Sequence, residues 1–343
     1  MRDRFRDLRP REEQRVSVAN DGIKRRTVSF YKYVRLDDPE KTRQELIKSW
    51  KKLGCLGRIY IASEGINAQM NVPEAQWEVF DKELRLINEF ADVVYKVAVE
   101  EGSAPSFYRL SVKIRDKIVA DGLDDESFDV TNTGAYLTAE EFNTYLDDPD
   151  AVVVDMRNGY ESEVGHFPGA ILPDVDTFRD ELQVVPKLLA GQENRKIALY
   201  CTGGIRCEKA SAWLLHKGFS DVRHLRGGVI DYARQACDEN IPNRFRGKNF
   251  VFDDRLGERI SNEVISTCHL CAREKSDTHY HCRNEICHVL FLGCGKCVDR
   301  YGGYCSNSCR LIDKLPDWVK KTIARLKKKR VGSQFKKHRL RHG

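Results

Sequence analysis

The segment YCTGGIRC at residues 200–207 holds the residues best suited to chemistry. An apolar run ends at Tyr200 and a helical pattern follows Cys207, so we expect Cys201 at the carboxyl end of a parallel strand, where α/β proteins place their sites. Two glycines let backbone N–H groups turn toward the sulfur, and the helix N-terminus and Arg206 add positive charge. We therefore predict that Cys201 is a nucleophilic thiolate and that Arg206 stabilises it. The other residues of this active-site loop are Thr202, Gly203, Gly204, Ile205 and Cys207.

This loop permits more than one kind of sulfur chemistry. Its amides could hold a second sulfur, a persulfide anion or an oxidised sulfur species on Cys201. Cys207 either resolves an oxidised Cys201 as a disulfide or packs inside the following helix. The simpler alternative is an ordinary buried cysteine near a glycine turn, which the nearby arginine and the expected topology disfavour.

Three segments upstream of the loop resemble the rhodanese fold family. They are DMR at 155–157, YESE at 160–163 and GHFPGA at 165–170, which match the family's D-x-R, Y-E and G-H-x-x-G-A segments. The resemblance implies an α/β domain in which Cys201 carries sulfur. Asp155 and Arg157 are then expected to order the loops through an ion pair rather than to touch the substrate.

Two other catalytic interpretations fit the residues less well. A cell-cycle dual-specificity phosphatase on the same fold uses a longer H-C-x5-R loop, whereas here Tyr200 precedes the cysteine and only four residues separate it from Arg206. A Cys–His dyad would need His166 beside Cys201, but in the rhodanese pattern this histidine lies in a loop with a structural role. We therefore favour sulfur chemistry at Cys201.

Eight of the twelve cysteines lie within residues 268–309 as four short-spaced pairs. Such pairs are typical of two tetrahedral zinc sites with four thiolates each. We favour a cross-brace, in which the first and third pairs bind one ion and the second and fourth bind the other; sequential pairing is the alternative. An iron–sulfur cluster, metal-free thiols and replacement of a ligand by His269, His279, His281 or His288 are the other possibilities. The expected ligands are Cys268, Cys271, Cys282, Cys287, Cys294, Cys297, Cys305 and Cys309.

Residues 25–125 are predicted to form an α+β domain ahead of the loop-bearing domain. The hydrophobic periodicity indicates strands and amphipathic helices in the order β-α-β-β-α-β, which is that of a ferredoxin-like sandwich. The strands are expected at 27–34, 58–62, 67–72 and 93–99, the helices at 38–53 and 73–87, and further strand-like sequence at 107–119. Phe30, Tyr31 and Tyr33 could stack on the splayed bases of an RNA loop such as an anticodon, or pack in the core. Phe30 faces one side of the first strand and the two tyrosines face the other, so all three cannot be binding residues.

Residues 133–237 are predicted to form an α/β domain with a parallel sheet, because β-branched runs alternate with helical patterns. Strands are expected at 151–155, 196–200 and 222–225, and helices at 139–146, at 208–217 and from 228 through 232. The rest of the predicted organisation is a polar leader at 1–24, an acidic linker at 121–133, a cysteine-rich module at 247–312 and a basic tail at 313–343.

Hydropathy and charge limit the class of protein. The 343 residues have a mean hydropathy of −0.54 and no apolar stretch approaching the ~20 residues of a membrane helix. The arginine-rich N-terminus lacks the apolar segment of a signal peptide, so we expect a cytoplasmic protein with reduced cysteines and no membrane partner. Residues 320–343 hold eleven positive charges and no acid, which leaves −5 for the rest of a chain of net charge +6. This segment is either a contact for nucleic-acid phosphates or a solvated tail.

From about residue 26 to residue 309 the sequence is similar to the bacterial tRNA uridine(34) hydroxylase family. Beside the loop at 200–209, the segments that carry this resemblance are FYKY at 30–33, ASEGINAQ at 62–69, KIRDKIVADG at 113–122 and GKNFVFD at 247–253. The resemblance implies an oxidoreductase of the EC 1.14 type that converts wobble uridine 34 to 5-hydroxyuridine, with molecular oxygen as co-substrate. It also implies the tRNA anticodon stem-loop as partner and Cys201 as the essential cysteine.

The loop chemistry alone does not lead to this reaction. Hydroxylating a pyrimidine with oxygen usually needs a flavin or a redox metal, yet we find no Rossmann motif for flavin or nicotinamide and no obvious two-histidine, one-carboxylate iron triad. Either Cys201 adds to carbon 6 of uridine and activates carbon 5 toward an oxidant, or a persulfide or peroxidised sulfur on Cys201 transfers the oxygen. The alternatives are a sulfurtransferase that passes persulfide sulfur to tRNA or a protein, and a non-catalytic RNA-binding scaffold.

Overall fold

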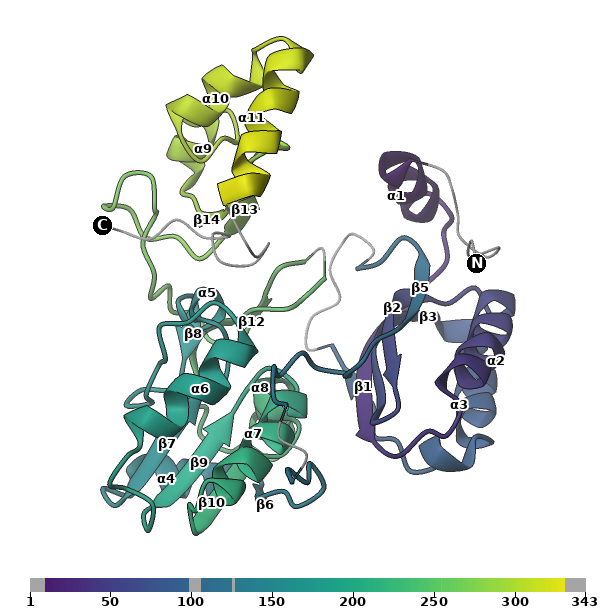
Figure 1. Ribbon diagram of the computed structural model, residues 1–343, viewed down its shortest axis with the longest axis vertical. Helices are drawn as coiled ribbons and strands as arrows, with labels where there is room; N and C mark the ends of the chain where they lie inside the picture. The colour runs from purple at the N-terminus through teal and green to yellow at the C-terminus, as the bar shows by residue number, and fades with distance from the viewer. Residues whose placement is uncertain (1–9, 99–105, 125–126, 254, 331–343) are drawn as a thin grey trace.

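The computed structural model divides the chain into three parts that follow one another along the sequence (Figure 1). It describes residues 10–98, 106–124, 127–253 and 255–330. The predicted leader contains a helix, α1 (Arg11–Ala19), which polar composition did not reveal. Residues 1–9 of this leader and residues 331–343 of the predicted basic tail lie outside the described residues. Within the described residues, no helix has the length and apolar character needed to cross a membrane.

The N-terminal domain is a sheet covered on one face by helices, which confirms the predicted ferredoxin-like sandwich. Its elements are β1 (Arg25–Tyr33), α2 (Pro39–Lys52), β2 (Leu56–Ala62), β3 (Gly65–Pro73), η1 (Glu74–Gln76), α3 (Trp77–Arg85), η2 (Asn88–Phe90), β4 (Lys96–Val97) and β5 (Leu110–Ile114). The strand order is β4-β1-β3-β2, with β5 added parallel to β2. Helix α2 begins as predicted because the Asp38 carboxylate accepts a hydrogen bond from the Lys41 N–H. In Figure 1, α2 and α3 cover the sheet face that points away from the central domain.

The central domain confirms the predicted parallel sheet. Its elements are β6 (Ala135–Leu137), α4 (Ala139–Asp147), β7 (Ala151–Asp155), α5 (Gly159–Ser162), β8 (Gly165–His166), α6 (Phe178–Leu188), β9 (Lys196–Tyr200), α7 (Ile205–His216), β10 (Asp221–Leu225) and α8 (Gly228–Asp238). The strand order is β6-β10-β9-β7, and every pairing between them is parallel. The buried strand β9 carries core residues on both faces, as its unbroken apolar run predicts. Helix α6 was not predicted, because Pro186 lies inside it and obscures the helical pattern.

The C-terminal module is attached to the central domain through a small antiparallel sheet. Its elements are β11 (Arg246–Asn249), β12 (Glu258–Arg259), β13 (His279–His281), β14 (Leu290–Leu292), α9 (Gly295–Tyr301), α10 (Asn307–Asp313) and α11 (Asp317–Arg330). Strand β11 pairs with both β12 and β8, so the module shares a sheet with the central domain. The close approach requires glycine at position 165, since a Cβ there would lie 2.1 Å from the Lys248 carbonyl oxygen.

A buried lysine joins the N-terminal and central domains. The ammonium of Lys209, on α7, donates to Asp121 at 2.7 Å and to both carboxylate oxygens of Glu64 at 2.9 and 3.0 Å. Lys209 and Asp121 are almost fully buried. The segment predicted as a linker therefore begins with a residue that is fixed by an ion pair between the domains.

We predict that Lys209→Met lowers the free energy of unfolding by about 3 kcal/mol, because it leaves two carboxylates without their buried cation. Urea denaturation followed by circular dichroism measures the change. The control is Lys196→Met, which removes a more exposed ion pair with Asp148 and should cost less than about 1 kcal/mol. Equal losses in the two variants would contradict a special role for Lys209.

Candidate active site and cysteine clusters

Cys201 lies at the turn between β9 and α7. Its side chain is fully buried, and its Sγ accepts a hydrogen bond from the Gly204 N–H at 3.1 Å. Gly204 has a φ of +93°, a conformation that side-chain-bearing residues rarely adopt, so glycine is needed for this N–H to point at the sulfur. The sulfur thus lies at the positive end of a helix of 12 residues.

The pKa of Cys201 falls to about 6 although the side chain is buried. Burial acts to raise this pKa, but the hydrogen bond from the Cys207 thiol, the charge of Arg206 and the N–H groups of Cys207 and Gly204 together lower it further. The pKa of Cys207 is raised well above its ordinary value by burial and by the adjacent Cys201. Cys207 therefore stays protonated, packs in the core and donates to the thiolate.

Arg206 is held in place by a carboxylate that sequence reasoning did not include in the site. Its guanidinium donates to both oxygens of Glu161, at 2.7 and 2.8 Å, and to the Thr202 hydroxyl at 3.2 Å. The Thr202 hydroxyl in turn donates to Glu161 at 3.1 Å. The Y-E segment at 160–161 was the available signal, because a buried arginine beside a thiolate needs a partner to fix its position.

Asp155 and Arg157 form a fully buried ion pair at 2.7 Å. Arg157 also donates to the Gly165 carbonyl at 2.6 Å, so the pair connects the end of β7 with β8. His166 does not form a dyad with Cys201: its Nδ1 lies 2.9 Å from the Ser162 carbonyl oxygen, and its side chain lines a pocket of about 380 Å³. These residues organise the surroundings of the loop, and within the described residues none of them forms a hydrogen bond or an ion pair with the Cys201 sulfur.

The N-terminal domain packs on the loop through two tyrosines of β1. The Tyr33 hydroxyl donates to the Ile205 carbonyl at 3.2 Å, and the Tyr31 hydroxyl donates to Glu208 at 2.9 Å. Phe30 points the other way, into the core of the N-terminal domain, as the alternation predicts. Tyr31 and Tyr33, which were candidates for stacking on anticodon bases, thus contact the start of α7.

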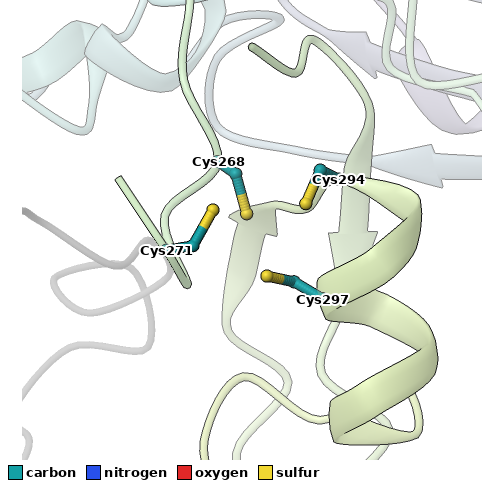
Figure 2. A group of neighbouring side chains, drawn as sticks. All are labelled: Cys268, Cys271, Cys294 and Cys297. Carbon is teal, nitrogen blue, oxygen red and sulfur yellow. The ribbon is translucent and has the colours of Figure 1, made fainter. Parts of the chain in front are cut away.

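The eight cysteines of the C-terminal module gather in two groups of four, and the sulfurs of each group lie within 4.8 Å of one another. Figure 2 shows the sulfurs of one group pointing toward a common centre. In the other group, the Sγ atom of Cys305 lies 3.5 Å from that of Cys309 and 3.7 Å from that of Cys287. A tetrahedron with metal–sulfur bonds of ~2.3 Å has edges of about 3.8 Å, so both groups could bind a metal ion. The groups are Cys268, Cys271, Cys294 and Cys297, and Cys282, Cys287, Cys305 and Cys309.

This grouping is that of a cross-brace and not of sequential pairing. Neither group includes a histidine among the residues that the structure describes. His269, one of the possible substitutes, instead places its Nε2 2.7 Å from Glu163 of the central domain and accepts at Nδ1 from the Leu292 N–H. It therefore connects the module to the central domain.

Comparison with known proteins assigns the chain to a family. Models of a UPF0176 acylphosphatase-like domain, a rhodanese-like domain and a C-terminal rhodanese domain match residues 25–118, 138–235 and 246–310. A tRNA uridine(34) hydroxylase of Leptospira interrogans is 51% identical over 313 residues, which cover 91% of this chain and 85% of the relative. The chain belongs to the tRNA uridine(34) hydroxylase family. The family's protein from Salmonella arizonae is 48% identical over 301 residues, which cover 85% of this chain and 86% of the relative.

In this member of the tRNA uridine(34) hydroxylase family, the site combines two of the matched domains. Cys201, Arg206 and Glu161 lie within the rhodanese-like match, and Tyr31 and Tyr33 lie within the acylphosphatase-like match. The arrangement can hold a buried thiolate, or a second atom bonded to it, against backbone N–H groups and a fixed guanidinium.

We predict that the Cys201 thiol ionises with a midpoint near pH 6. The measurement is the thiolate absorbance at 240 nm, titrated as the difference between the protein and Cys201→Ser. Arg206→Met should raise the midpoint, because it removes a positive charge that stabilises the thiolate. Arg223→Met, which removes a guanidinium paired with Asp221 on β10, is the control and should leave the midpoint unchanged. A midpoint near the ordinary value of about 8.5 in the unaltered protein would contradict the assignment.

Proposed function

We propose that this protein hydroxylates uridine 34 of tRNA at carbon 5 and that Cys201 is its catalytic residue. The observation that carries the proposal is the identity of about one residue in two with tRNA uridine(34) hydroxylases over most of the chain. The buried, ionised Cys201 in an intact loop supports it, because a non-catalytic scaffold has no need for such a group. The enzyme would act as an oxygen-inserting oxidoreductase of the EC 1.14 type, in the cytoplasm.

The reaction replaces a hydrogen on carbon 5 with a hydroxyl group. With molecular oxygen as the oxygen source, it takes two electrons and two protons from a reductant, and the second oxygen atom leaves as water. Cys201 can contribute by adding to carbon 6, which makes carbon 5 electron-rich, or by carrying the oxygen on its sulfur. In both routes Gly204, Cys207 and Arg206 keep the sulfur anionic before it reacts.

A sulfurtransferase is the second candidate, because the loop could equally hold a Cys201 persulfide. It is not favoured, since the relatives that match most of the chain are named as hydroxylases. The two candidates differ in the product that they leave on tRNA, which is either a hydroxylated or a thiolated base.

The C-terminal module is proposed to bind tRNA and to hold two structural zinc ions. Helix α11 carries exposed Lys321 and Arg325, and Trp318 at its start is 73% exposed. Cations that neutralise phosphates together with an aromatic ring for stacking suit the anticodon stem-loop. The two cysteine groups would fix the module that presents this helix, since a closed four-thiolate site is typical of structural zinc.

We predict that the purified protein contains about two zinc ions per chain. Inductively coupled plasma mass spectrometry measures this content. Cys268→Ser should lower the content to about one, because three thiolates bind zinc more weakly than four. The control is Cys237→Ser, which replaces an exposed cysteine outside both groups and should leave the content at two. Folded protein without zinc, or with iron in its place, would contradict the assignment.

We predict that Cys201→Ala abolishes 5-hydroxyuridine and its derivatives in tRNA. The measurement is mass spectrometry of anticodon nucleosides from cells that lack the protein and are complemented with either variant. Cys237→Ala is the control and should restore the modification. Retained product with Cys201→Ala would refute the catalytic assignment, and loss of a thiolated base instead would establish the sulfurtransferase.

A further inference from the structure

A buried lysine of the N-terminal domain lies against the Cys201 loop, and the described residues offer its ammonium no hydrogen-bond acceptor. Lys96, on the short strand β4, is only 6% exposed. Its Nζ lies 4.4 Å from the centre of the Tyr31 ring, and within the described residues it has no hydrogen bond or ion pair. Holding a lysine side chain this deep in the protein with no acceptor among the described residues costs free energy, so this arrangement requires an explanation.

The surroundings of Lys96 belong to the active site. A Cβ added to Gly203 would lie 3.8 Å from the Lys96 Cδ, so the lysine stem passes alongside the loop. A Cβ on the next glycine would lie 2.8 Å from the Tyr31 hydroxyl, which places that ring directly on the loop. Burial lowers the pKa of Lys96. The negative charges of Asp231, Glu208 and Cys201 act in the opposite direction and reduce this lowering.

Comparison with Lys209 shows that the burial of Lys96 is not explained by an ion pair between the domains. Lys209 is equally buried but fills its donor positions with Asp121 and Glu64. Among the residues that the structure describes, no acceptor takes a hydrogen bond from the Lys96 ammonium, which lies beside the Cys201 loop. The missing acceptor is therefore expected to be a group on the substrate.

The local charge favours a neutral acceptor. Glu208, Asp231 and Cys201 already supply negative charge in the surroundings of Lys96, although none of them forms an ion pair with it among the described residues. These negative charges would repel a phosphate, whereas a neutral carbonyl oxygen would not be repelled in this way. In uracil, the 4-carbonyl is conjugated with the bond between carbons 5 and 6. When a thiolate adds to carbon 6, the sulfur–carbon bond forms, the π electrons of that bond shift, and the negative charge comes to rest on oxygen 4.

We propose that Lys96 is a substrate-binding residue that donates a hydrogen bond to the 4-carbonyl of the uracil base at Cys201. This inference rests on the proposed function, because it takes wobble uridine as the substrate. Lys96 holds the base against the loop and stabilises the charge that forms on oxygen 4. The acylphosphatase-like domain thus supplies part of the active site rather than only binding tRNA.

The test measures binding without depending on turnover. The probes are two anticodon stem-loop RNAs, one with uridine at position 34 and one with the 2-pyrimidinone nucleoside, which lacks oxygen 4. The full-length protein should bind the uridine RNA about tenfold more tightly, since a hydrogen bond from a charged donor distinguishes the two bases. Lys96→Met should bind both RNAs equally. Lys96→Arg, which keeps a cationic donor, should recover part of the preference.

The matched control is Lys52→Met on the opposite face of the N-terminal domain, where the lysine is exposed. It should keep the tenfold preference and the activity, whereas Lys96→Met should lower kcat/KM for 5-hydroxyuridine formation by about 100-fold. If folded Lys96→Met keeps the preference for the uridine RNA, the proposal is overturned. It is also overturned if the unaltered protein shows no preference, and this second measurement decides the matter if the variants do not fold. A Lys96-dependent preference without 5-hydroxyuridine formation would support the role of Lys96 and refute the proposed hydroxylation instead.

Discussion

The structure around the loop depends on keeping one charged sulfur out of contact with water. Burial alone would keep Cys201 as a thiol, so the charge has to be supported by groups fixed nearby. The Gly204 N–H does this directly, but only because a left-handed glycine turns it toward the sulfur. Arg206 acts through its field, and it is fixed only because Glu161 holds both of its donor atoms.

The requirement for charge balance extends to residues farther from the sulfur. Glu181, on α6, is fully buried, and within the described residues neither of its carboxyl oxygens has a hydrogen-bond partner. Burial raises its pKa well above the ordinary value, and nearby Glu161 and Cys201 raise it further. The charge of Arg206 acts the other way, but burial is the larger effect and favours the neutral form of Glu181, which does not oppose the thiolate. A second ionised carboxylate near Arg206 would weaken the positive field on which Cys201 depends.

The fold was predictable where local patterns decide it. The limits of β7 and β9 follow from unbroken β-branched and apolar runs, and the start of α2 follows from an aspartate cap and a proline. The two four-cysteine groups follow from pair spacing, although spacing cannot distinguish a cross-brace from sequential pairs, and three-dimensional proximity was needed for that. Helix α6 was not predicted because it contains a proline, which locally disfavours a helix. Packing of its buried face nevertheless stabilises the helix.

The sequence of the loop was enough to propose Cys201 as the catalytic residue, but its neighbours from another domain could not be predicted. Tyr31, Tyr33 and Lys96 lie more than 100 residues away in sequence, and no periodicity indicates that the sheet face opposite α2 and α3 covers that loop. Their presence has a chemical consequence. A thiolate with a pKa near 6 is prone to oxidation when oxidants and solvent reach it freely. An enzyme of the proposed kind, which uses such a sulfur with an oxidant, must prevent other molecules from reacting with it. The N-terminal domain packed on the loop covers the sulfur in this way. The sheet of the N-terminal domain that covers the sulfur also carries Lys96, the residue proposed to recognise the base. Covering the sulfur and binding the base both require side chains beside the Cys201 loop.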